Sequence, residues 1–142
     1  MMRRLRVIAV LGIVSIVAIA CGGSDGGDGE PAGGDVVVDM DDFSLDAAPG
    51  THTAGAVTFE IRNGGPSVHA LTIIRSDAAS DALPVENGLI PEGQVDVVDE
   101  ETDIPPGADA TLSTELEAGS YILVCNLPAH YESGMYAAFT VE

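Results

Sequence analysis

Lysine is absent from this chain of 142 residues, and only five arginines offset 23 acidic side chains. Three of them, Arg3, Arg4 and Arg6, precede an apolar run at the N-terminus. If that segment is removed, Arg62 and Arg75 remain and the net charge becomes −21. Such a surface repels nucleic acids and anionic lipid headgroups, so we expect no nucleic-acid partner. It suits a basic protein partner or a salty habitat, and is equally compatible with solubility alone.

A long membrane-spanning run is also missing. The apolar stretch that ends at residue 20 is shorter than the roughly 20 residues that a transmembrane helix needs. It follows the arginines and ends in A-I-A-C, which is the layout of a secretory signal and resembles a bacterial lipobox. We therefore expect a signal peptide over residues 1–20, lipidation of Cys21, and a location on the outer face of the cytoplasmic membrane or in the periplasm. A plain signal peptide cut nearby and an uncleaved anchor are the alternatives, and all three export the domain.

Cysteine is scarce, and its second copy lies far from the first. Residues 22–35, GGSDGGDGEPAGGD, contain no large apolar side chain, so residues 21–35 are predicted to form a flexible tether to the membrane. With Cys21 lipidated, Cys125 has no partner for a disulfide. An unpaired thiol in an exported protein oxidises or cross-links, so Cys125 needs either burial or a ligand.

No segment after residue 35 has the 3.6-residue period of a helix. Apolar side chains instead alternate in five segments, which are 57–61, 69–73, 110–116, 121–125 and 135–141. Alternation bounded by turn residues is typical of antiparallel sheets with one buried face. The sequence therefore predicts an all-β fold, a Greek-key β-sandwich or barrel of about seven or eight strands, in one domain over residues 36–142.

Three further patterns refine this prediction. Residues 36–45 change phase between Met40 and Phe43, which indicates a β-bulge. Residues 76–107 are acidic and proline-containing, and are expected to form a long connection with one short strand or helical turn. In LEAGSY, a turn glycine precedes Tyr121 by two residues, which is the layout of a tyrosine corner, although an ordinary surface tyrosine is the alternative.

The stretch CNLPAHYESGM places Cys125, His130 and Met135 within eleven residues. Cys125 ends one strand on its buried face, Met135 begins the next, and His130 lies in the middle of the loop between them. His69 begins another strand on the inward side. Each residue alone has an ordinary explanation, as a buried thiol, a core methionine or a loop histidine. Their joint spacing and strand phase favour a metal site at one end of the sandwich.

The chemistry of these four side chains favours one metal. The set contains no carboxylate, which excludes calcium and magnesium, and one thiolate with one thioether favours copper over zinc. Two histidines and one cysteine in a plane, with a weak axial methionine, form the blue-copper arrangement.

The motif C-x4-H-x4-M, with an upstream histidine that opens a strand after N-G-G, resembles the cupredoxins, and its loop length is like that of the rusticyanin and sulfocyanin type. The resemblance implies one copper ion held by His69, Cys125, His130 and Met135, and single-electron transfer. Many members have asparagine directly after the first histidine, where this chain has Ala70. The bracing of the site must then come from elsewhere, such as Asn63 or Asn126.

With all four ligand positions filled by protein, no position is open for a substrate, so we do not expect an enzyme. Electrons would pass through the edge of His130, within an apolar rim formed by Leu127, Pro128, Ala129 and Tyr131. The expected partner of the monomer is a basic redox protein such as a cytochrome. Two other functions stay open: a copper carrier or storage protein, and a metal-free sandwich that binds a partner.

Overall fold

The computed structural model describes residues 34–142, so the expected signal peptide and the lipidated Cys21 lie outside the described residues. The described part contains nine strands and a 3-10 turn, η1 (Glu92–Gln94). None of its helices is long and apolar enough to cross a membrane. The strands are β1 (Val36–Asp41), β2 (Ser44–Ala48), β3 (Thr51–His52), β4 (Gly55–Asn63), β5 (His69–Arg75), β6 (Asp96–Ile104), β7 (Asp109–Leu116), β8 (Gly119–Val124) and β9 (Tyr136–Val141).

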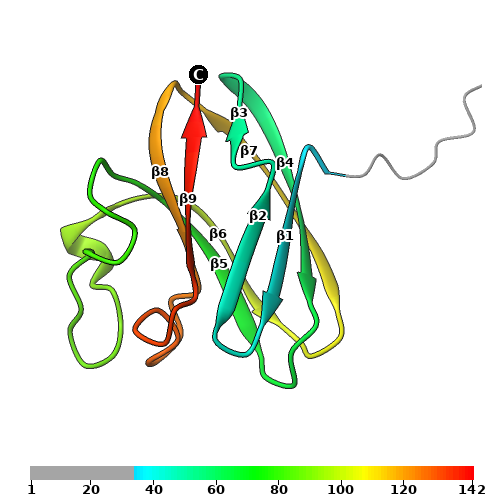
Figure 1. The fold of residues 1–142 in the computed structure, drawn as a ribbon, viewed down its shortest axis with the longest axis vertical. Coiled ribbons are helices and arrows are strands. Elements are labelled where there is room, and N and C mark those ends of the chain that lie inside the picture. The colour runs from blue at the N-terminus through cyan, green and yellow to red at the C-terminus, as the bar shows by residue number, and fades with distance from the viewer. Residues whose placement is uncertain (1–33) are drawn as a thin grey trace, which may run out of the picture.

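These strands form two sheets, and Figure 1 shows them facing each other. One sheet has the order β2-β1-β4-β7 and the other β3-β9-β8-β5-β6. The predicted all-β sandwich is confirmed. The alternation in β4 and β9 directs one set of side chains into the space between the sheets, where Phe59 meets Phe139 edge-to-face at 5.5 Å between ring centroids. Burial of such side chains, each contributing about 2 kcal/mol, stabilises the sandwich.

Strands β5 and β8 are buried on both faces, which simple alternation does not predict. The connection over residues 76–95 packs on the outer face of their sheet and covers it (Figure 1). It forms a second core cluster with side chains from β5, β8 and the loop after β8, namely Ile74, Leu83, Ile90, Ile122, Val124 and Tyr131.

The bulge expected over residues 36–45 is wrong, because a hairpin occupies this segment. Strands β1 and β2 pair antiparallel, with Asp41 opposite Ser44, so Asp42 and Phe43 form a two-residue turn. Phe43 adopts a φ of 67°, and its side chain is 57% exposed. A two-residue turn reverses the chain direction, which accounts for the change of phase in the apolar pattern.

The connection over residues 76–107 is more regular than expected, since it contains both η1 and the nine-residue β6. Strand β6 pairs with β5 at the edge of its sheet, and only Ile104 is buried. The acidic side chains that obscure the strand pattern suit an exposed edge, because charge there discourages pairing with other chains.

The tyrosine corner is confirmed. The hydroxyl of Tyr121 donates a hydrogen bond of 2.7 Å to the carbonyl oxygen of Glu117, four residues earlier. This bond fixes the turn that leads from β7 into β8.

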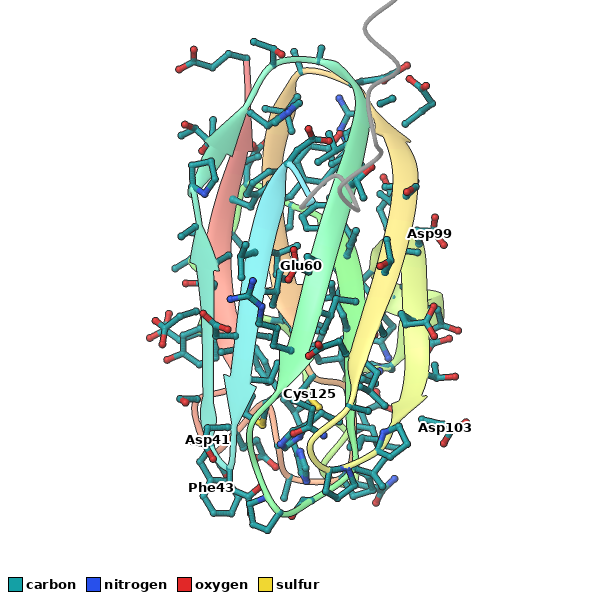
Figure 2. All side chains as sticks on the ribbon, turned by 90° about the vertical axis from the view of Figure 1, so that its right-hand side faces the viewer. Asp41, Phe43, Glu60, Asp99, Asp103 and Cys125 are labelled. Atoms are coloured by element: carbon teal, nitrogen blue, oxygen red, sulfur yellow. The ribbon has the colours of Figure 1, made fainter. Side chains whose placement is uncertain are left out.

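Four chain segments meet at one end of the sandwich, opposite the C-terminus (Figure 1). They are the β1–β2 turn, the β4–β5 loop, the β6–β7 turn and the loop between β8 and β9. In Figure 2, Cys125 lies between the sheets near this end, where Asp41 and Phe43 also lie. The fold therefore brings the predicted ligand loops together.

Candidate metal centre

His69, Cys125 and His130 converge at this end of the sandwich. The Nδ1 atoms of the two histidines are 3.3 Å apart. The Sγ atom of Cys125 lies 3.9 Å from Nδ1 of His69 and 3.4 Å from Nδ1 of His130. His69 and Cys125 are fully buried, whereas His130 is half-buried and closes the cluster on the solvent side. Three donor atoms this close together are compatible with a single metal ion.

Met135 is fully buried immediately before β9. Its backbone N–H donates to the carbonyl oxygen of His130 at 3.2 Å, and its own carbonyl oxygen accepts the N–H of Cys125 at 3.0 Å. These two bonds tie both ends and the middle of the loop into one compact unit. The backbone of Met135 thus lies beside that of Cys125 just beyond the paired ends of β8 and β9, and its role as the fourth ligand stays a prediction.

Burial shapes the protonation of the cluster. Burial raises the pKa of the Cys125 thiol, and hydrogen bonds from the backbone N–H groups of Ala70 and Leu127 partly oppose this effect. Burial also lowers the pKa of His69, and the neighbouring His130 lowers it further. The metal-free site therefore favours a neutral thiol and a neutral imidazole at neutral pH. A metal ion that binds here must displace the thiol proton.

Asn63 braces the loop that carries His69. Its side chain, 2% exposed, donates from Nδ2 to the carbonyl oxygens of Ser67, Ile104 and Pro105 at 2.8, 3.0 and 3.1 Å. Its Oδ1 accepts the N–H of Gly65 at 3.0 Å. One side chain thus joins the β4–β5 loop to the end of β6.

Asn126 and Tyr131 brace the second loop against the connection over residues 76–95. Asn126 accepts the N–H of Ile90 at 2.8 Å and donates to its carbonyl oxygen at 3.1 Å. The Tyr131 hydroxyl accepts the N–H of Leu83 at 3.0 Å and donates to the carbonyl oxygen of Ser80 at 2.8 Å. The expectation that Tyr131 belongs to an exposed rim is wrong, because its side chain is buried in this second layer.

Two contacts at the site come from the unexpected hairpin turn. The ring of Phe43 lies edge-on to His130, with centroids 6.3 Å apart. Asp42 places Oδ1 at 3.3 Å from Nε2 of His69, on the side of that ring away from the cluster. The phase change between Met40 and Phe43 was the only signal for this turn in the sequence.

The donor set fits copper better than the other common metals. It consists of two imidazole nitrogens and one cysteine sulfur, and a buried methionine lies beside it. This is the composition of a blue-copper site, in which a cysteine and two histidines surround the metal. The carboxylate of Asp42 faces the far side of His69, outside the cluster.

Comparisons with known proteins agree with this fold. No family model and no curated protein sequence matches the chain significantly. Among solved structures, it is similar to dithionite-reduced auracyanin from Roseiflexus castenholzii, with 18% identity, a TM-score of 0.55, and coverage of 75% of this chain and 94% of that one.

Two further structures are described as copper proteins. Auracyanin A from Chloroflexus aurantiacus, a "blue" copper protein, is 18% identical with a TM-score of 0.52, over 75% of this chain and 99% of that one. The copper protein rusticyanin is 19% identical with a TM-score of 0.54, over 75% and 76% of the two chains. The chain described here therefore has the cupredoxin fold, with a buried His-Cys-His cluster at the end of its sandwich that can hold one metal ion.

Proposed function

We propose that this chain is a type 1 copper protein that transfers single electrons outside the cytoplasm. The observation that carries the proposal is the convergence of two histidine Nδ1 atoms and the Cys125 sulfur within 3.9 Å of one another. Bound copper would supply one-electron redox chemistry, with His69, Cys125 and His130 as ligands and Met135 as the axial fourth. No substrate position remains among four protein ligands, which supports a carrier of electrons and not an enzyme.

The surroundings of His130 support exchange with a protein partner. His130 is the most exposed of the three clustered residues, and the exposed aromatic side chain of Phe43 lies beside it. Phe43 contacts its ring, and Val68 directly precedes His69. Such a patch excludes water from a transient contact, while the acidic remainder of the surface attracts a basic partner such as a cytochrome.

Export and membrane attachment belong to the same proposal. The lipobox-like A-I-A-C and the tether that follows support a lipid anchor at Cys21. Gly34 and Asp35, at the end of this tether, already bond to β4, since Asp35 accepts the N–H of Thr58 at 2.9 Å. Mass spectrometry of the membrane-bound protein should find residues 1–20 removed and a lipid on Cys21. A membrane-bound protein with an unmodified Cys21 would refute this anchor.

Optical and EPR spectra after addition of Cu(II) test the copper site. We expect an intense visible thiolate-to-copper band that a Cys125→Ser variant lacks. Met135→Leu should keep the band and shift the reduction potential, because the axial ligand tunes it. Met40→Leu changes a buried methionine in β1 and serves as the control. Its spectrum and potential should match those of the wild type.

The same spectra separate the alternative functions. A copper carrier or storage protein would hold Cu(I), and would be colourless and redox-silent. A metal-free sandwich would contain no copper after purification and would bind none. Either result would refute the proposed electron transfer.

A further inference from the structure

The far side of the His69 ring meets a carboxylate. Nε2 of His69 lies 3.3 Å from Oδ1 of Asp42, and both atoms are buried without a hydrogen-bond partner of good geometry. The opposite ring nitrogen, Nδ1, faces Cys125 and His130. A buried nitrogen and a buried carboxylate oxygen at this distance are expected to pair, because neither has another hydrogen-bond partner and buried polar groups are normally paired.

The carboxylate is held in place from its other side. The hydroxyl of Ser67 donates to Oδ2 of Asp42 at 2.9 Å. Gly65 covers the pair, since a Cβ built on it would lie 2.8 Å from Oδ1 of Asp42 and 3.1 Å from Nε2 of His69. Any larger residue at position 65 would push the two apart. The β4–β5 loop therefore forms a fitted cradle for the carboxylate at the tip of the hairpin.

We propose that Asp42 is a positioning residue for the metal centre: its carboxylate accepts the Nε2–H of His69 and holds the ring with its Nδ1 lone pair toward Cys125 and His130. This inference rests on the proposed copper site. An ionised carboxylate only accepts hydrogen bonds, so it selects the tautomer that carries hydrogen on Nε2. The lone pair of Nδ1 is then directed into the cluster, where a metal ion requires it.

This role of Asp42 would replace the bracing that an asparagine at position 70 would give, which Ala70 cannot provide. Ala70 contributes only its backbone N–H, which lies 3.4 Å from the Cys125 sulfur. The chain instead orients His69 from the opposite edge of the ring, through Asp42 and Ser67. The negative charge beside one ligand also stabilises Cu(II) more than Cu(I), because the oxidised ion carries the larger positive charge.

The first test uses metal-free protein with ¹⁵N-labelled histidine. Long-range ¹H–¹⁵N NMR spectra, recorded where His69 is neutral, should show hydrogen on its Nε2 in the wild type. In Asp42→Ala the Nδ1–H form should appear, whereas in Asp42→Asn the amide oxygen should preserve much of the original tautomer. Asp46→Ala, at an exposed position of β2, is the control with the same loss of charge. A wild-type His69 with hydrogen on Nδ1 would overturn the proposal.

The second test measures copper. We expect Asp42→Ala to weaken Cu(II) affinity by about 10–100-fold, the usual effect of removing a partner of a ligating histidine. If Cu(I) affinity is unchanged, each tenfold loss raises the reduction potential by about 59 mV. Asp46→Ala should change both quantities far less. Equal shifts in the two variants would show a general charge effect and would refute the positioning role.

A third pair of variants keeps Asp42 itself unchanged. Gly65→Ala inserts a methyl group against Asp42 and His69, and should reproduce the loss of Cu(II) affinity. Gly64→Ala is the matched control, because its Cβ would meet only the Met40 carbonyl oxygen at an ordinary 3.7 Å. Equal copper affinity in these two variants would contradict the inference that the small residue at position 65 maintains the contact between Asp42 and His69. A wild type that binds no copper would instead refute the proposed function, while the NMR result would still decide the role of Asp42.

Discussion

Replacement of Asn63 by alanine should destabilise the fold and loosen one ligand loop. The buried amide donates to three carbonyl oxygens and accepts one backbone N–H, at distances of 2.8–3.1 Å. Two of these partners, the Ile104 carbonyl oxygen and the Gly65 N–H, belong to buried residues. In the variant both would lose this hydrogen bond in a position that water reaches poorly.

The magnitude follows from the number and setting of these bonds. At about 1 kcal/mol for each hydrogen bond, with more for a buried group left unpaired, Asn63→Ala should cost about 3–5 kcal/mol. Asn126→Ala offers a matched comparison, because it removes only two hydrogen bonds, both to Ile90. It should cost about 2 kcal/mol. Urea denaturation of the metal-free proteins measures both values, provided that the denaturant slope stays constant.

Copper affinity separates a general loss of stability from a specific effect on the site. Asn63 holds the loop that positions His69, so Asn63→Ala should weaken Cu(II) binding even at temperatures where the variant is fully folded. If Asn63→Ala lowers the free energy of unfolding by less than about 1 kcal/mol, the estimate based on its hydrogen bonds is refuted. A folded variant with wild-type affinity would show that other contacts hold His69.

Three further substitutions should have smaller effects, and the unaltered Cys125 offers a fourth test. Tyr121→Phe removes the corner hydrogen bond and should lower the free energy of unfolding by about 1 kcal/mol. Tyr131→Phe removes two bonds to residues 80–83, so limited proteolysis should cut that segment faster. Gly134→Ala forces a side chain onto a φ of +112° and should lower the melting temperature. The Cys125 thiol of the metal-free protein should react slowly with a thiol reagent at neutral pH, because burial raises its pKa, and quickly once urea unfolds the chain.

Much of the sandwich could be predicted because one buried face leaves a period-two pattern. Strands β4 and β9 show that pattern clearly, and their inward residues are those expected. Strands β5 and β8 do not, because both of their faces are buried. The connection over residues 76–95 covers the outer face of these two strands with Leu83 and Ile90, two apolar residues that stand isolated among prolines and acidic residues. The local sequence pattern does not indicate what such isolated residues contact.

His69 and Cys125 could be predicted because strand phase fixes which side chains point inward, and His130 because it lies in the short loop that joins Cys125 to Met135. Asp42 could not. It is one of 23 acidic residues, and nothing in its neighbourhood along the chain distinguishes it from the others. Its contact with His69 depends on the hairpin turn, which a change of phase indicates but does not distinguish from a bulge. Long-range contacts made by short turns are thus the part of the site that sequence patterns leave open.

The two ligand loops are braced by separate parts of the fold, which bears on the proposed electron transfer. Asn63 ties the His69 loop to β6, while Asn126 and Tyr131 tie the Cys125–Met135 loop to the outer layer. Neither set of braces includes a ligand atom, so the cluster can assemble without help from a metal. A site assembled in advance changes little when its metal gains or loses an electron, and a small rearrangement permits fast transfer. The connection over residues 76–95, which covers β5 and β8, therefore does more than bury apolar area. It also keeps the loop that carries three of the four proposed ligands in one conformation.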